Sequence, residues 1–135
     1  MKIKLLTICL FIFTSQVFAE VKEVNNEEMI SLMKNGVPVI DIRRADEWHD
    51  TGVINQSNLL TFFDKNGNHN TEEWLPKLKK IAKKGDPVII ICRSGKRSGI
   101  VSKLLDEQAN YINVYNASGG MVSWISLKNK TVKPN

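Results

Sequence analysis

Cysteine and proline are scarce in this chain, and long hydrophobic runs are missing. Only two cysteines and four prolines occur among the 135 residues. Cys9 lies in the first apolar segment, so a chain cleaved after that segment would keep Cys92 as its single thiol. One thiol cannot close an internal disulfide, so Cys92 is either an inert core residue or a reactive group.

The longest hydrophobic run, residues 5–13, is too short to cross a membrane, because a span needs roughly 18 apolar residues. Two lysines precede this run, and Val17-Phe18-Ala19 places small residues where a signal peptidase cleaves. That order of parts is typical of a secretory signal peptide. We therefore expect residues 1–19 to be a signal peptide and residues 20–135 to be a single exported domain, in the periplasm and without a stable membrane anchor.

The basic residues are scattered along the chain or paired, as in Lys83-Lys84, although the net charge is +5. Aromatic residues make up only 7% of the chain and do not alternate with the basic ones, as a nucleic-acid groove requires. We expect no nucleic-acid partner. His49 and His69 are far apart, and with one cysteine they give no metal-ligand spacing, so we expect no metal and no cofactor.

Short apolar segments alternate with segments of helical spacing. Val37–Ile42, Pro87–Ile91 and Ile112–Tyr115 are predicted as strands, and the first two are too apolar for a strand with one wet face. Strands that alternate with helices predict an α/β fold with a mainly parallel central sheet flanked by helices.

Helical spacing is found in four places. One helix is expected to begin with Asn26 as its N-cap, and Gly119-Gly120 leads into a short helix near the end of the chain. Two longer helices are expected over residues 71–84 and 98–110, the first of them interrupted or kinked by a proline. The polar tail, residues 128–135, is expected to be frayed.

The most informative residues follow the strand Pro87–Ile91, which delivers Cys92 to its carboxyl end, where α/β sheets bind ligands. Residues 92–97, the cysteine loop, contain one glycine and three cations and precede a helix. If the loop curls around the sulfur, its backbone N–H groups and the helix N-terminus favour the thiolate. A thiolate can attack a sulfur donor and keep its charge as a persulfide. An inert thiol is expected among apolar neighbours instead.

Three parts of the sequence resemble the rhodanese sulfurtransferases. The segment Cys92-Arg93-Ser94-Gly95-Lys96-Arg97 resembles their six-residue active-site loop. Asp41-Ile42-Arg43, Glu47-Trp48 and Gly52-Val53-Ile54 resemble the family's Asp-x-Arg, Glu-aromatic and Gly-His-Ile stretch, and Gly119-Gly120 followed by Trp124 resembles its C-terminal signature. Two residues depart from the family pattern: Val53 replaces the usual histidine, and Gln56 stands where a glycine is common.

The resemblance implies a rhodanese-like domain that moves a sulfane sulfur from thiosulfate or a similar donor to cyanide or a thiol. Cys92 would be the catalytic persulfide carrier. The small anionic donor would bind to the rest of the loop: Arg93, Ser94, Gly95, Lys96 and Arg97. Asp41 and Arg43 would support the site, and we expect a partly buried ion pair with each other or with Glu47 rather than a substrate contact.

Other functions stay open. Cys92 could pass sulfur to a protein acceptor in a relay, with little activity on free thiosulfate. Non-catalytic binding modules of the same fold usually lose the cysteine, which this chain keeps. Cysteine phosphatases and arsenate reductases hold an arginine six positions after the cysteine, where this chain has Ser98.

Overall fold

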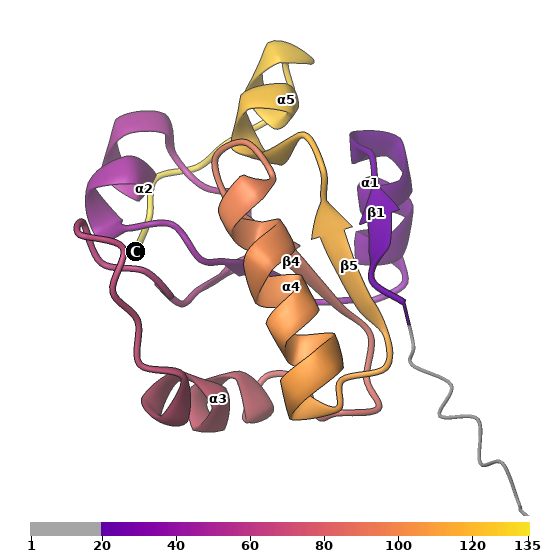
Figure 1. Cartoon of the computed structure of the whole chain (residues 1–135). Coiled ribbons are helices and arrows are strands. Elements are labelled where there is room, and N and C mark those ends of the chain that lie inside the picture. Colours follow the sequence, from indigo (N-terminus) through magenta and orange to yellow (C-terminus); the bar gives the residue numbers. More distant parts are fainter. Residues whose placement is uncertain (1–19) are drawn as a thin grey trace, which may run out of the picture.

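The computed structural model describes residues 20–135, and the expected signal peptide lies outside these residues. Five strands of the described chain form one sheet in the order β1-β5-β4-β2-β3, and every neighbouring pair is parallel (Figure 1). The strands are β1 (Lys22–Val24), β2 (Val39–Asp41), β3 (Asn58–Leu59), β4 (Val88–Ile91) and β5 (Val114–Ala117). The predicted α/β fold with a parallel central sheet is therefore confirmed.

Helices cover both faces of the sheet. They are α1 (Asn26–Lys34), α2 (Ala45–Thr51), α3 (Thr71–Lys79), α4 (Lys96–Ala109) and α5 (Gly120–Ser126). On one face, Trp74 and Leu78 of α3 share a core with Leu105 of α4, and α4 runs across the front of the sheet in Figure 1. On the other face, Met29 of α1 and Trp124 of α5 share a second core with sheet residues.

Strand β4 explains why the site lies where it does. Its four residues are fully buried, with Ile90 in the α3–α4 core and Ile89 and Ile91 in the α1–α5 core. A strand that is covered on both faces gives a nearly continuous apolar run, as the sequence has here. Cys92 follows β4 directly, at the edge where the carboxyl ends of all the parallel strands meet.

Several predicted boundaries were wrong. The N-cap of α1 is Asn25 rather than Asn26, because Asn25 forms a reciprocal capping box with Glu28. The third helix ends at Lys79 rather than at residue 84, and it continues through Pro76, which is exposed and costs the helix a single backbone hydrogen bond. The last strand is β5 rather than residues 112–115, since Ile112 is 55% exposed in the turn before it.

The C-terminal tail was predicted to be frayed, and this prediction was wrong. Val53 and Val132 form an antiparallel bridge, with both N–H···O distances at 2.9 Å. The indole Nε1 of Trp124 also donates to the carbonyl of Lys130. The tail therefore packs against the segment after α2, and Val53, one of the two residues that depart from the family pattern, is buried beneath it. No helix in the described part of the chain is long and apolar enough to span a membrane.

Candidate active site

Cys92 lies at the carboxyl end of β4, and only 1% of its surface is exposed. Its Sγ accepts a hydrogen bond from the backbone N–H of Gly95 at 3.2 Å. The hydroxyl Oγ of Ser98, in the first turn of α4, lies 3.2 Å from the same sulfur. The cysteine loop therefore curls back over the sulfur, and two polar groups contact a thiol that is otherwise part of the apolar α3–α4 core.

Gly95 makes this curl possible. It is the N-cap of α4 and has φ = +92°, in the left-handed region that glycine adopts without strain. A Cβ at this position would overlap the backbone carbonyl of Ser118, which follows β5. Any other residue would push the Gly95 N–H away from Cys92, so the glycine is required for the hydrogen bond to the sulfur.

The N-terminus of α5 fixes the first two residues of the loop. The N–H groups of Met121 and Val122 donate to the carbonyls of Cys92 and Arg93, both at 2.9 Å. Gly120 allows this approach, because it has φ = +56° and a Cβ there would overlap the Arg93 carbonyl. The Gly119-Gly120 signature thus lets the N-terminus of α5 pack against the backbone of the cysteine loop.

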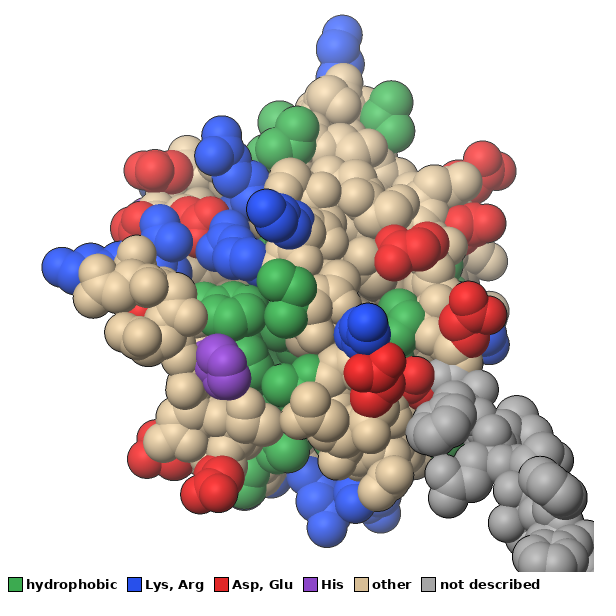
Figure 2. All heavy atoms as spheres, viewed as in Figure 1, with side chains coloured by type: hydrophobic (Ala, Val, Ile, Leu, Met, Phe, Trp, Pro, Cys, Tyr) green, Lys and Arg blue, Asp and Glu red, His purple; other side chains and the backbone are tan. Residues whose placement is uncertain are grey.

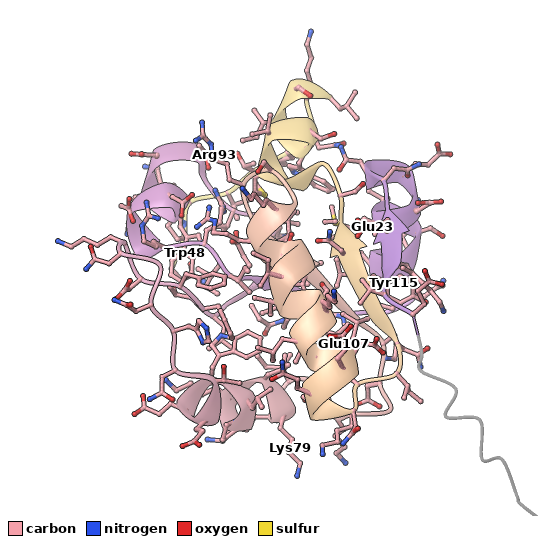
Figure 3. All side chains as sticks on the ribbon, in the orientation of Figure 1. Glu23, Trp48, Lys79, Arg93, Glu107 and Tyr115 are labelled. Carbon is pink, nitrogen blue, oxygen red and sulfur yellow. The ribbon has the colours of Figure 1, made fainter. Side chains whose placement is uncertain are left out.

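Asn116 of β5 is hydrogen-bonded to the cysteine loop. Its Nδ2 donates to the carbonyl of Gly95 at 3.2 Å and to the two carboxylate oxygens of Glu23 at 2.9 and 3.1 Å. Asn116 is buried, whereas Glu23 lies on the edge strand β1, next to β5 in Figure 3. The edge strand is therefore connected through one carboxamide to the residue whose N–H contacts the sulfur.

Arg97 pairs with Glu47 of α2. Its Nη1 and Nη2 donate to Glu47 Oε2 and Oε1 at 2.8 and 2.6 Å. Hydrogen bonding to Arg97 lowers the pKa of Glu47 from 4.5 to about 2, and Glu47 in turn raises the pKa of Arg97 above its ordinary value. The charges of Cys92 and Asp41 act on Arg97 in the same direction, so this guanidinium stays protonated beside the loop.

Asp41 and Arg43 pair with each other, which is one of the two pairings expected from the sequence, and the pair is fully rather than partly buried. Arg43 Nη2 lies 2.7 Å from Asp41 Oδ2, and each side chain is 1% exposed. The remaining N–H groups of Arg43 donate to the Thr51 hydroxyl at 2.8 Å and to the Gly52 carbonyl at 3.0 Å. Arg43 thus ties the end of β2 to the C-terminus of α2, on which Glu47 lies.

The other predicted binding residues are at the surface. Arg93, Ser94 and Lys96 are exposed, and neither Arg93 nor Lys96 forms an ion pair within residues 20–135. Lys96 and Arg97 belong to the first turn of α4 rather than to the loop before it. Arg93 lies between α2 and α5 in Figure 3. Figure 2 shows basic and acidic side chains together over α2 and the start of α4, beside a hollow with hydrophobic walls.

A cavity of about 580 Å³ meets the loop at Arg93, between α2 and α5. Arg44 and Asp46 lie on its α2 side, and Val122 and Ile125 form an apolar wall on α5. Cys92 does not line this cavity. The cavity therefore borders the loop without reaching the sulfur.

Three contacts of the site were not predicted from the sequence: Ser98 with the sulfur, Asn116 with the loop, and Glu47 with Arg97. The signal for Ser98 was its position, since a hydroxyl in the first turn of a helix lies near the preceding loop. The signal for Glu47 was its charge in a motif next to a cationic loop. Nothing in the sequence indicates Asn116, because its contacts join strands that are distant in the chain.

A model of the rhodanese-like domain matches residues 25–127 of this chain. A search of curated proteins gave no significant match. Forty-one solved chains match. One is a rhodanese-like domain protein from Staphylococcus aureus, which is 24% identical with a TM-score of 0.57. The match covers 77% of this chain and 91% of that chain.

Two further structures are of proteins that are described by an activity. A polysulfide-sulfur transferase homodimer from Wolinella succinogenes is 18% identical with a TM-score of 0.64, and the match covers 87% of this chain and 82% of that one. A protein described as a possible tyrosine phosphatase, from Rhodopseudomonas palustris, is 19% identical with a TM-score of 0.62, with coverage of 83% and 85%. At these identities the likeness shows the fold alone.

Proposed function

Since this chain belongs to the rhodanese-like domain family, we propose that it is a sulfurtransferase and that Cys92 carries the sulfur. The observation that supports this most directly is the setting of the Cys92 sulfur. It lies at the carboxyl end of a buried strand, and it is contacted by the Gly95 N–H and the Ser98 hydroxyl. Donors around a buried sulfur favour a nucleophilic thiolate over an inert thiol.

In the first half-reaction, the Cys92 thiolate attacks the outer, sulfane sulfur of thiosulfate or a similar donor. The bond from Cys92 to that sulfur forms, and the S–S bond of the donor breaks with its electron pair leaving on sulfite. One negative charge on the enzyme is retained, now on the outer sulfur of the persulfide. The exposed cations Arg93 and Lys96 would attract the anionic donor.

In the second half-reaction, cyanide or a thiolate attacks the outer sulfur of the persulfide. The new bond joins this sulfur to the acceptor, and the pair of the breaking S–S bond returns to Cys92. The product is thiocyanate or an organic persulfide, and the enzyme is again a thiolate. No electron donor beyond the two substrates is needed, so the cycle balances.

The phosphatase alternative is disfavoured by Ser98. Phosphatase chemistry needs an arginine at that position to hold the phosphoryl oxygens, whereas Ser98 is fully buried with its hydroxyl on the sulfur. The nearby guanidinium, Arg97, is bonded to Glu47 instead. A short loop closed over one sulfur fits sulfur transfer better.

Mass spectrometry of the purified protein tests the proposal. Incubation with thiosulfate should add the mass of one sulfur atom to the peptide that contains Cys92, and cyanide should remove it with formation of thiocyanate. Cys92→Ser should fold normally and take up no sulfur. Turnover that persists in this variant would refute the mechanism. If a protein thiol but not cyanide removes the sulfur, the protein acts in a relay.

We also propose that the enzyme is exported, from the signal-like pattern of residues 1–19. N-terminal sequencing of the protein from the periplasmic fraction should begin at Glu20. Recovery of the intact chain from the cytoplasm would contradict export, and it would leave the proposal for Cys92 unaffected.

A further inference from the structure

Ser98 is buried against the reacting atom, although it lies outside the six-residue loop. Its exposure is 0%, and its Oγ is 3.2 Å from Cys92 Sγ. We propose that Ser98 is a further catalytic residue, whose hydroxyl donates a hydrogen bond to the Cys92 thiolate and stabilises the charge on Sγ in both half-reactions. This inference rests on the proposed role of Cys92 as the nucleophile.

The direction of the hydrogen bond follows from the charge of the sulfur. A thiolate has no proton, so it can only accept, and the hydroxyl of Ser98 must be the donor. Within residues 20–135, Ser98 Oγ has no other partner. By contrast, Ser57 and Ser126 each donate to the carbonyl three residues earlier. The Ser98 proton is therefore available to Cys92 alone.

The sulfur needs this donor because other compensation for its charge is limited. Cys92 belongs to a core that includes Ile42 and Val101, and burial among apolar side chains disfavours an anion. The charge of Arg97 is offset by Glu47, and Lys96 is exposed to water. The two groups in direct contact with Sγ are thus the Gly95 N–H and the Ser98 hydroxyl.

The geometry also predicts in which state Ser98 matters. In the persulfide, the negative charge lies on the outer sulfur and Sγ is a neutral divalent sulfur. A donor aimed at Sγ therefore favours the thiolate, which is the nucleophile of the first half-reaction and the leaving group of the second. Loss of this donor makes the thiolate more basic. A more basic thiolate is a better nucleophile once ionised, but a poorer leaving group.

Ser102 provides a matched control. It lies one turn after Ser98 on α4 and is equally buried, yet its Oγ has no hydrogen-bond partner among residues 20–135. Ser102→Ala removes a buried hydroxyl from the same helix, but it leaves the contact between Ser98 and the Cys92 sulfur intact. Ser98→Thr keeps a hydroxyl at the site and should preserve much of the effect.

The experiment follows the rate of iodoacetamide alkylation of Cys92 against pH, with the modified peptide identified by mass. In Ser98→Ala the midpoint of this profile should rise by about one to two pH units, the size expected for loss of a hydrogen bond to a charged group. Ser102→Ala should match the wild type. An unchanged midpoint in Ser98→Ala overturns the proposal, and so does an equal shift in Ser102→Ala, which would indicate a general effect of helix packing.

Single-turnover rates give a second readout. Above the alkylation midpoints of both proteins, Ser98→Ala should form the persulfide at least as fast as the wild type but pass its sulfur to cyanide roughly three- to tenfold more slowly. Equal slowing of both steps would contradict the assignment. The alkylation profile needs no sulfur transfer, so a wild type that never takes up sulfur would refute the proposed function without deciding the role of Ser98.

Discussion

Glu47 and Arg97 are fifty residues apart in the sequence and form a two-point ion pair, with N···O distances of 2.6 and 2.8 Å, between α2 and the first turn of α4. Both side chains are partly covered, at 15% and 25% exposure. The pair fixes one side of the cysteine loop, and it offsets the charge of a cation that the sequence assigned to substrate binding. The role of Arg97 in substrate binding stays a prediction, and its positive charge is partly offset by Glu47.

A double-mutant cycle should measure this pair. The variants Glu47→Gln, Arg97→Gln and their combination should give a coupling of about 1–2 kcal/mol in the free energy of urea unfolding, because the geometry is bidentate and partly buried. Lys103 and Glu107, 3.8 Å apart and exposed on the same helix, are the control pair and should couple by less than about 0.5 kcal/mol. Equal coupling in the two pairs would contradict a special role for the first.

The same carboxylate predicts a dependence of stability on pH. The pKa of Glu47 is about 2 in the folded protein and 4.5 ordinarily, so its contribution is fully present above about pH 4.5 and is lost as the pH falls toward 2. Between pH 6 and pH 2.5, the wild type should lose roughly 1–2 kcal/mol more unfolding free energy than Glu47→Gln, a value reduced for solvent screening. Urea titrations at each pH measure this difference, and Glu107→Gln should behave as the wild type.

Arg93 and Lys96 should account for the electrostatic attraction of the donor, because both are exposed and have no ion pair in the described chain. Replacing both with alanine should raise KM for thiosulfate by about tenfold, with a smaller change in kcat, and the difference should shrink as salt screens the charges. The control is the double variant Lys83→Ala/Lys84→Ala, which also removes two positive charges. These lysines precede β4, at the end of the strand opposite to Cys92, so KM should be unchanged. An unchanged KM in the first variant would mean that the loop binds its donor through the backbone alone.

Local patterns were enough to predict a mainly parallel central sheet, the position of Cys92, and the pairing of Asp41 with Arg43 as one of two expected arrangements. Each of these depends on residues that are close in the sequence or on a continuous apolar run such as β4. Strand β1 was not predicted, because it has three residues, two of them exposed, and becomes a strand only by pairing with β5. The partners of Arg97 and Gly95 were missed for the same reason, since Glu47 and Asn116 reach them only after the chain has folded.

Asn116 should control the position of the Gly95 N–H, and its replacement by aspartate is the sharpest test. The side chain of Asn116 is 3% exposed, and its Nδ2 faces the Glu23 carboxylate and the Gly95 carbonyl, both acceptors. An aspartate has no N–H to offer and places a second carboxylate beside the first, so the loop should lose its support. We expect a loss of about 2–3 kcal/mol of unfolding free energy and faster hydrogen exchange at the Gly95 amide. Glu23→Gln keeps an acceptor for Asn116 and should change both values little. If Asn116→Asp destabilises the protein while the exchange of Gly95 stays as in the wild type, Asn116 supports the fold and not the loop.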